Sequence, residues 1–457
     1  MASKSKLSDR PFLKNTVSAL IWTSIMTSSF DVVLNLEAAG VTFRFTQLLA
    51  AAVIVLFAAE AIRGAAFRFP VSFGYLVLVF LFNTVWIYRS RDTGNAIGYD
   101  LWLAFNLLEI LAFSYFLSLY ETLDSLLQKY IVCFDILAAV GILQFLLELA
   151  GIRFFAMQFY ETPYGFYRRA NGFSYEPSYY ATYMLMGCGA CLYLLEKKNH
   201  LAMGKRMLCV SAVLNVGALI LSTSRMGWLI LIAYLMSRSA LGMVRYCQRR
   251  AHSKAQLVRL LAAPLLVLLL ASVVILGLRQ GNSLVLVYTQ GLGLGGDMRS
   301  AGPRITALLD TWTIFKNSPF QGFSLGGIDS EIACIKGLSY ATELNGSYSM
   351  CVSVEALAAY GLIGAILFFK YIYDTTVGCY CRIRTAEHLE AGKKQLIYAL
   401  LLGHVLVFMA LQFNQNILRQ PYWAHLAVIS AAELLSTTKR EEGQRKAYLL
   451  RIPALFT

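Results

Sequence analysis

The chain has 457 residues, of which 58% are hydrophobic and only 14% are charged, and its mean hydropathy is +0.58. These values exclude an ordinary soluble domain, in which about a quarter of the residues are charged. The net charge of +14 is concentrated partly in the basic segment 245–259, which predicts contact with anionic lipid rather than with nucleic acid. We therefore expect an all-α polytopic membrane protein whose residues 1–457 form a single integral membrane domain.

Twelve apolar segments are each long enough to cross ~30 Å of hydrocarbon. They lie at 15–33, 42–62, 70–88, 100–119, 130–150, 177–195, 207–223, 227–244, 260–278, 351–370, 395–413 and 420–437. The first segment follows four cations, but it is longer than the core of a signal peptide and has no small-residue cleavage site. We expect it to be retained as the first of about twelve transmembrane helices.

The distribution of Lys and Arg predicts the orientation in the membrane. With the N-terminus in the cytoplasm, 27 of the 40 cationic residues lie in inside segments and 13 lie outside. This excess agrees with the positive-inside rule. It places both termini in the cytoplasm and two longer segments, 151–176 and 279–350, on the outer side.

The outer cations are mostly arginine, with 11 Arg to 2 Lys, whereas the inside segments hold 14 Arg and 13 Lys. Planar guanidinium groups bind phosphate and carboxylate through two parallel hydrogen bonds, which lysine cannot do. The excess of arginine therefore favours an outer site for a lipid-linked pyrophosphate. Contacts with lipid headgroups and snorkelling at helix ends are the structural alternative.

Several carboxylates lie in or beside the apolar segments. Asp31 near the outer end of the first segment and Arg44 at the start of the second are expected to pair across a short outer turn. Buried carboxylates are costly in a membrane and usually have partners or face water. The same expectation applies to Glu60, Glu109, Asp135 and Glu148.

Segment 151–176 ends in a group of polar and aromatic residues just before Pro177, which suits the first turn of a helix. We expect Arg168 and Arg169 to face an anion in an outward cavity and Glu176 to orient or deprotonate a sugar hydroxyl. Helix capping by Glu176 is the structural alternative. The tyrosines are expected either to line a carbohydrate path or to form an interfacial belt; they are Tyr164, Tyr167, Tyr175, Tyr179 and Tyr180.

Arg225 lies in a turn too short to leave the membrane boundary. An unpaired charge at this depth would cost several kcal/mol. Arg225 therefore needs either a neighbouring carboxylate or a pyrophosphate delivered from the bilayer.

Segment 279–350 contains one predicted amphipathic helix near 304–317, within the stretch from Ala301 to Phe323, with Arg304 at its start. Its predicted apolar stripe consists of Ile305, Leu308, Leu309, Trp312 and Phe315. A cation at a helix start is poorly placed against the helix dipole. An anionic partner explains Arg304 better than helix stability does.

Three motifs together resemble the O-antigen ligase/polymerase family. They are Ser222-Thr-Ser-Arg-Met-Gly227, the outer segment with Pro303-Arg304, Trp312 and Asn317-Ser-Pro-Phe-Gln-Gly-Phe323, and Tyr360-Gly-Leu-Ile-Gly364. The segment Arg169 to Ser178, with Gly172-Phe-Ser-Tyr-Glu176-Pro-Ser178, is most similar to Wzy-type polymerases of O-antigens, capsules and exopolysaccharides. The resemblance covers most of 165–370.

The resemblance implies a C-type glycosyltransferase-like fold in a bacterial inner membrane, with the active site facing the periplasm. It implies undecaprenyl-pyrophosphate-linked oligosaccharides as substrates, membrane lipids as surroundings, a chain-length regulator as a partner, and no cofactor or metal. A polymerase would use Glu176, Arg304 and Arg225 as catalytic residues. The substrate would be bound by Arg168, Arg169, Arg225, Arg304, Tyr175 and Tyr179.

Ligases of this family resemble one another in a histidine ten residues before the Gly-x-x-Gly pair, where this chain has Met350 and Cys351. No histidine is expected outside, since His200, His252 and His388 lie in inside loops and His404 and His425 lie within apolar segments. A polymerase is therefore favoured over a ligase acting on lipid A-core. Glu176, or more weakly Glu343, is left as the group that assists the acceptor hydroxyl.

Other patterns predict less. Gly291 to Asp297 is expected to be a flexible loop, and Asp329 with Glu331 is not expected to bind a metal. Cys334 and Cys351 both lie near the outer side and could pair. A lipid-linked oligosaccharide flippase or transporter is the alternative from another functional class, although the large outer segment and the lack of visible repeats count against it.

Overall fold

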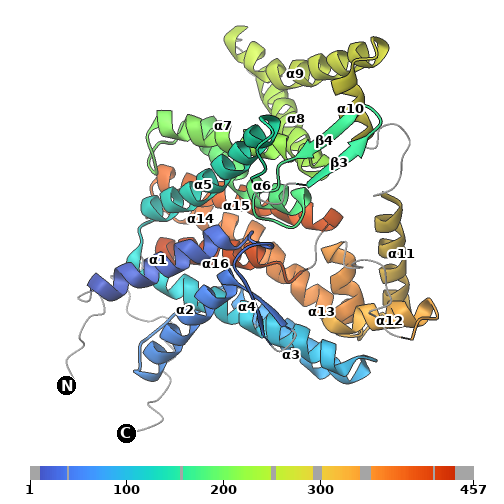
Figure 1. Cartoon of the computed structure of the whole chain (residues 1–457). Helices are drawn as coiled ribbons and strands as arrows, with labels where there is room; N and C mark the ends of the chain where they lie inside the picture. The colour runs from blue at the N-terminus through green and yellow to red at the C-terminus, as the bar shows by residue number, and fades with distance from the viewer. Residues whose placement is uncertain are drawn as a thin grey trace.

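The computed structural model describes residues 11–38, 41–154, 158–248, 254–291, 301–339, 351–414 and 417–437. Helices dominate these ranges (Figure 1). The α-helices are α1 (Pro11–Thr27), α2 (Phe45–Ile62), α3 (Phe73–Val85), α4 (Thr93–Tyr120), α5 (Leu123–Leu149), α6 (Pro177–Lys197), α7 (Lys205–Leu221), α8 (Arg225–Cys247), α9 (Lys254–Arg279), α10 (Ser283–Gly291), α11 (Ala301–Asn317), α12 (Ile328–Ile335), α13 (Val352–Tyr373), α14 (Cys379–Thr385), α15 (Ala391–Asn414) and α16 (Gln420–Thr437).

Each of the twelve predicted apolar segments coincides with one of these helices. Within the described ranges, 7 helical segments are long and apolar enough to cross a membrane. They are Phe45–Ile62, Thr93–Tyr120, Leu123–Leu149, Arg225–Cys247, Leu260–Arg279, Val352–Thr385 and Ala391–Phe413. The chain is thus an all-α protein built from membrane-length helices, while a total of twelve spans stays a prediction.

Helices α6 and α16 form the centre of the molecule. α6 packs against α15 and α7, and α16 packs against α4. The approach of α6 to α15 depends on small residues, because a Cβ added at Gly189 would lie 2.8 Å from the Cα of Gly403. Such small-residue contacts let helices pack closely in a membrane, where apolar burial supplies little driving force.

The two sheets found in the described residues are antiparallel hairpins, which the sequence analysis did not predict. β1 (Asn35–Ala38) pairs with β2 (Val41–Arg44), and β3 (Gln158–Thr162) pairs with β4 (Gly165–Arg169). Strands of four or five residues give too few alternating positions for a reliable pattern. The β3–β4 hairpin lies in the predicted outer segment 151–176, whereas β2 extends from the predicted outer turn into the start of the predicted apolar segment 42–62.

Helix α11 ends at Asn317 as predicted and begins three residues before the predicted start, at Ala301, but its buried face is not the predicted one. Ile305, Leu309 and Trp312 of the predicted apolar stripe are 50%, 58% and 41% exposed. The buried positions are Ala307, Thr311 and Ile314, on a helix that packs against α13. Ile305, Leu309 and Trp312 are therefore left on the surface, while Leu308 and Phe315 of the predicted stripe are half-buried.

The segment after α11 is locked onto a kink in α13 by direct backbone contact. Gly361 interrupts the helix with φ +61°, and Leu362 N–H donates to the carbonyl of Pro319 at 2.7 Å. A Cβ at Gly361 would lie 2.4 Å from the Phe320 carbonyl, and a Cβ at Gly322 would lie 2.3 Å from the Ala359 carbonyl oxygen. Two of the quoted sequence motifs therefore meet at this junction.

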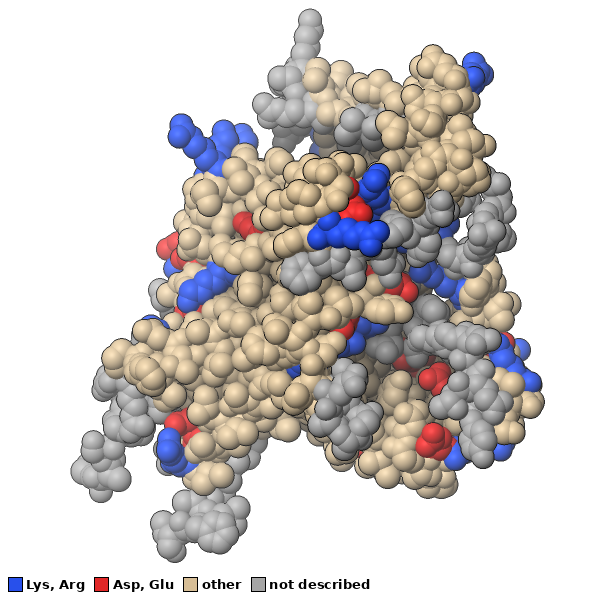
Figure 2. All heavy atoms as spheres, in the orientation of Figure 1, with Lys and Arg blue, Asp and Glu red and all other residues tan. Residues whose placement is uncertain are grey.

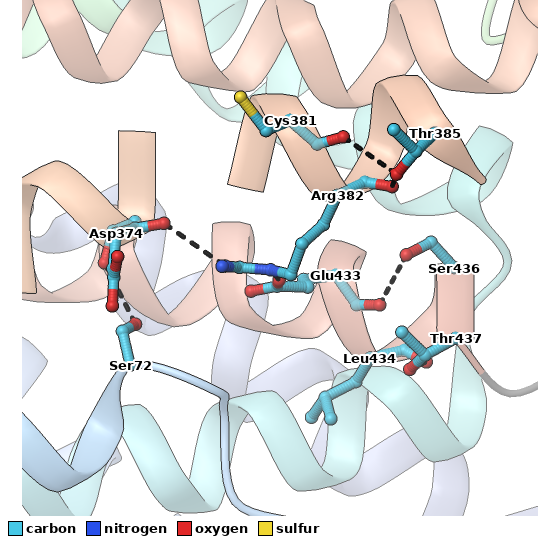
Figure 3. Close-up of polar contacts among 10 residues, drawn as sticks. Ser72, Asp374, Cys381, Arg382, Thr385, Glu433, Leu434, Ser436 and Thr437 are labelled. Atoms are coloured by element: carbon cyan, nitrogen blue, oxygen red, sulfur yellow. Dashed lines mark hydrogen bonds and ion pairs between the residues drawn. The ribbon is translucent and has the colours of Figure 1, made fainter. Parts of the chain in front are cut away.

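Segments assigned to the cytoplasmic side also meet one another. The Arg382 guanidinium contacts Glu433 Oε1 at 2.6 Å and donates to the Asp374 carbonyl at 3.2 Å. Figure 3 shows this side chain reaching from α14 between Asp374 and α16. Ser72 from the segment before α3 contacts Thr375 at 3.1 Å. Residues that the charge rule places on one side thus lie together.

Partners were expected for four carboxylates of the apolar segments, and three of the four make the expected contacts. Glu60 pairs with Arg63 at 2.9 Å, Glu109 accepts from Gln420 at 2.5 Å, and Asp135 accepts from Asn215 at 2.7 Å. The possible pairing of Cys334 with Cys351 is wrong, because both thiols are free. Much of the face shown in Figure 2 carries no Lys, Arg, Asp or Glu.

Candidate functional site

Strand β4 is attached to the loop between α7 and α8. Ala170 N–H donates to the Leu221 carbonyl at 3.0 Å, and Arg169 Nε donates to Thr223 Oγ1 at 3.1 Å. Tyr167, on the same face of β4, donates from its hydroxyl to the Thr223 carbonyl at 3.3 Å. Thr223 adopts φ +49°, a backbone conformation that residues other than glycine rarely adopt. These contacts hold Arg169 beside the start of α8.

Arg225 is the first residue of α8 and is exposed. Ser224 caps the helix, since its Oγ accepts from Gly227 N–H at 3.5 Å. Burial raises the pKa of Tyr167, while the Thr223 hydrogen bond, Arg169 and then Arg225 lower it. The guanidinium of Arg225 therefore lies in the same neighbourhood as that of Arg169.

The turn before α6 is fixed by hydrogen bonds to Gln144 of α5. Gln144 Oε1 accepts from the N–H groups of Asn171 and Gly172 at 3.2 and 2.9 Å. Ser174 Oγ donates to the Ser29 carbonyl at 2.9 Å. The chain thereby enters α6 in a fixed direction, with Glu176 at the N-cap position and Pro177 as the first helical residue.

Glu176 occupies the cap position without capping. In the described part of the chain, its side chain makes no hydrogen bond to an N–H of the helix start, and Oε2 accepts instead from Ser178 Oγ at 2.8 Å. The capping alternative thus does not account for this carboxylate. Glu176 is half-buried, so it keeps access to solvent or to a ligand.

Arg304 joins these residues from α11. Burial lowers the pKa of its guanidinium; Glu176 opposes this shift, Arg225 adds to it, Tyr179 opposes it and Arg169 adds to it, in decreasing order. Four side chains from β4, the start of α6 and the start of α8 are therefore close enough to act on Arg304 electrostatically. We call Arg169, Arg225, Arg304 and Glu176 the arginine group.

The arginine group lies where three helices begin. Glu176, Arg225 and Arg304 belong to the cap or first turn of α6, α8 and α11. Each helix start presents unpaired N–H groups and the positive end of the helix dipole. Three guanidinium groups and one carboxylate add a net charge of about +2 to these dipoles. This arrangement favours a ligand with two or more negative charges.

Two predicted site residues lie apart from this group. Arg168 lies on the opposite face of β4 from Arg169, because side chains alternate along a strand, and its guanidinium is 6.0 Å from the Phe166 ring centre. Tyr175 is 60% exposed, and its backbone N–H donates to Asp31 Oδ2 at 3.3 Å. The prediction that Arg168 and Arg169 face one cavity is not supported by this geometry.

Tyr179, by contrast, connects the arginine group to a second set of charges. The predicted pair of Asp31 with Arg44 is confirmed at 3.1 Å, and Arg419 contacts the same Asp31 Oδ1 at 3.3 Å. The Arg419 guanidinium lies 3.7 Å from the centre of the Tyr179 ring. We call Asp31, Arg44 and Arg419 the Asp31 triad. The sequence analysis identified two of its members but gave no reason to bring Arg419 to them.

The other residues considered as catalytic or metal-binding candidates pair with another side chain, are buried in the core, or lie outside the described residues. Glu331 pairs with Arg91 at 3.1 Å, and among the described residues no group of three or more His, Cys, Asp or Glu side chains could hold a metal ion. His404 and His425 are buried in the helical core. Glu343, Met350, His252 and the segment from Leu292 to Asp297 lie outside the described residues.

The sequence matches no protein-family model and no curated protein. The residues that meet at the arginine group therefore carry the functional proposal.

Proposed function

We propose that the chain is a polysaccharide polymerase, a membrane glycosyltransferase that moves a growing glycan from undecaprenyl pyrophosphate onto an undecaprenyl-pyrophosphate-linked repeat unit. The observation that carries this proposal is the meeting of Arg169, Arg225, Arg304 and Glu176 from four separate segments. Three guanidinium groups, two of them at helix starts and one at the end of β4, suit a pyrophosphate, and one carboxylate suits an acceptor hydroxyl.

In the proposed reaction, the acceptor hydroxyl oxygen attacks the anomeric carbon of the donor glycan. The bond from that carbon to the pyrophosphate oxygen breaks, and undecaprenyl pyrophosphate leaves with the electron pair. Arg304, Arg225 and Arg169 stabilise the negative charge that develops on this leaving group. Glu176 accepts the hydroxyl proton. The atoms and charges balance without a nucleotide sugar.

The surroundings of the arginine group agree with a lipid-borne substrate. The described residues include 7 helical segments of membrane length, and one of them, α8, begins at Arg225 itself. We propose a bacterial inner membrane with about twelve spans, cytoplasmic termini and a C-type glycosyltransferase-like arrangement, in which this group faces the periplasm. Membrane lipids surround the chain, and a chain-length regulator is the proposed protein partner.

Reconstitution tests the proposal directly. Purified full-length protein is placed in liposomes that carry lipid-linked repeat units on the face of the arginine group, and the products are separated by size. We expect a ladder of lengthened glycans from the wild type and from Arg91→Ala, whose arginine already pairs with Glu331, but not from Arg304→Ala. Translocation of the lipid-linked unit without lengthening would identify a flippase instead. Transfer only to lipid A-core would identify a ligase.

A further inference from the structure

A water-accessible cavity of about 430 Å³ lies beside the Asp31 triad. Its wall is formed by the triad, by four amide side chains and by two aromatic rings. The amides are Asn35, Gln47, Asn106 and Gln420, and the rings are Tyr99 and Trp102. These residues come from β1, α2, α4 and the start of α16, so the cavity is built by segments that are distant in sequence.

The charges at this cavity are largely compensated within the protein. Asp31, whose side chain is only 7% exposed, lies 3.1 Å from Arg44 and 3.3 Å from Arg419. Arg419 is further engaged by the Tyr179 ring. Two guanidinium groups that share a buried carboxylate bind an external anion less strongly than free ones do. The cavity is therefore a poor second pyrophosphate site.

Its remaining wall suits an uncharged molecule with many hydroxyl groups. Each amide carries both donors and an acceptor. Asn35 and Gln420 donate to the Asp31 carbonyl and to Glu109, which leaves their oxygens for a ligand, and Gln47 accepts from Arg44 N–H, which leaves its NH₂ group. Tyr99 and Trp102 are both half-buried and supply broad apolar faces with a polar atom at the edge. Asn106 is only 2% exposed although it lies within the helix α4; a buried amide at such a position is costly unless something pairs with it.

We propose that this cavity binds an uncharged saccharide of the lipid-linked glycan. This inference rests on the proposed function, which it extends by giving the glycan a site distinct from that of the pyrophosphate. Ligand sites of this kind combine apolar or aromatic walls with a few placed polar groups in a concave space. The volume accommodates a short oligosaccharide rather than a lipid headgroup with its acyl chains.

The position of the cavity relative to the arginine group gives the saccharide a role. Arg419 lines the cavity and stacks on Tyr179, and Tyr179 acts electrostatically on Arg304. Tyr179 therefore connects the two sites: its ring contacts Arg419 of the cavity wall, and it is close enough to Arg304 to act on it electrostatically. Holding the acceptor in the cavity would place its hydroxyl near Glu176 and lower the entropic cost of the transfer.

The first test measures binding without any reaction. Full-length protein in lipid nanodiscs is titrated with neutral repeat-unit oligosaccharide, released by mild acid from the polysaccharide of the source cells, and separately with inorganic pyrophosphate. We expect Trp102→Ala and Asn106→Leu to weaken oligosaccharide binding about tenfold or more and to leave pyrophosphate binding unchanged. Arg304→Ala should show the reverse pattern.

If Asn106→Leu fails to insert into the membrane, Trp102→Phe still tests the proposal. This variant retains an aromatic wall, so it should lose only part of the oligosaccharide affinity. Oligosaccharide binding that is unchanged in Trp102→Ala, or absent from the wild type, would overturn the proposal. So would pyrophosphate binding that depends on Trp102 rather than on Arg304.

A second measurement separates the two possible sources of the saccharide. In the polymerisation assay, Trp102→Phe should raise KM for the acceptor unit if the cavity holds the acceptor, and KM for the donor glycan if it holds the donor; we expect the acceptor. Unchanged KM values for both substrates would contradict the proposal that the cavity binds a saccharide of either substrate. If the wild type binds oligosaccharide through Trp102 but makes no polymer, the cavity is a saccharide site and the proposed polymerase function is wrong.

Discussion

The arginine group and the Asp31 triad use the same residue type at the same kind of position. Arg44 is the N-cap residue of α2 and Arg419 directly precedes α16, just as Arg225 and Arg304 begin α8 and α11. The two groups differ in how their arginines are paired with a carboxylate. Asp31 lies between both arginines of the triad at 3.1 and 3.3 Å, whereas in the other group Glu176 attracts Arg304 while Arg225 and Arg169 repel it.

This difference distinguishes arginines that stabilise the fold from arginines that bind a ligand. In the triad, attraction within the protein fixes the β1–β2 hairpin and the start of α16 to the end of α1. In the arginine group, the repulsion of Arg304 by Arg225 and Arg169 is an electrostatic cost that a polyanionic ligand removes. Arginine at a helix start is therefore a sign of function only when its local carboxylates do not balance it.

The largest effect is expected from Arg304, in the arginine group. Arg304→Ala should lower the rate of polymer formation by about 100- to 1,000-fold, because an oriented donor to the leaving group is removed. Arg304→Lys should recover little, since an ammonium group cannot match two phosphate oxygens at once. Initial rates in liposomes measure this, with Arg91→Ala as the matched control. Full activity of Arg304→Lys would remove the argument from guanidinium geometry.

The carboxylate of the same group should affect the rate without affecting the fold. Glu176→Gln keeps the shape but cannot accept a proton, so kcat should fall about 100-fold. Affinity for inorganic pyrophosphate should stay the same or rise, because one negative charge is removed. Loss of thermal stability with an unchanged kcat would show that Glu176 belongs with Asp31 as a structural carboxylate.

The positions of the helices could be predicted from the sequence, but their partners could not. Runs of apolar residues locate the helices, and Pro303 with Ser318-Pro319 fixes both ends of α11. The pairing of Arg419 with Asp31 joins residues 388 positions apart, and no local pattern carries that information. The same limit explains the buried face of α11, which is set by its contact with α13.

The junction between Gly322 and Gly361 shows what such long-range contacts do for the arginine group. Gly361→Ala must place a Cβ 2.4 Å from the Phe320 carbonyl while holding φ +61°. We expect a loss of about 3 kcal/mol in unfolding free energy and a displaced α11, hence a lower kcat. Thermal unfolding in detergent measures the first effect. Gly302→Ala, where a Cβ would meet nothing within 4 Å, is the control and should leave the stability unchanged.

Asp31→Asn tests the compensated side of the comparison. Two partly buried arginines would lose their common partner, so the unfolding free energy should fall by about 2 kcal/mol. The effect should largely disappear when Asp31→Asn is made in an Arg44→Gln, Arg419→Gln background, because no cation is then left unpaired. A stable Asp31→Asn protein that binds pyrophosphate more tightly would mean that the triad is an anion site held closed by Asp31.

The smallest effect concerns Asp329, a carboxylate of α12 that takes part in neither set. Burial raises its pKa above the ordinary value, so the folded state binds protons more readily than the unfolded state does. Stability should therefore fall as the pH rises from the ordinary pKa of an aspartate through the raised one. Asp329→Asn should remove this loss: its thermal midpoint should equal that of the wild type at about pH 3.5, below the ordinary pKa near 3.9, and exceed it at neutral pH. A variant that is less stable at neutral pH would instead show that the charged form of Asp329 has a partner, as Glu331 has in Arg91.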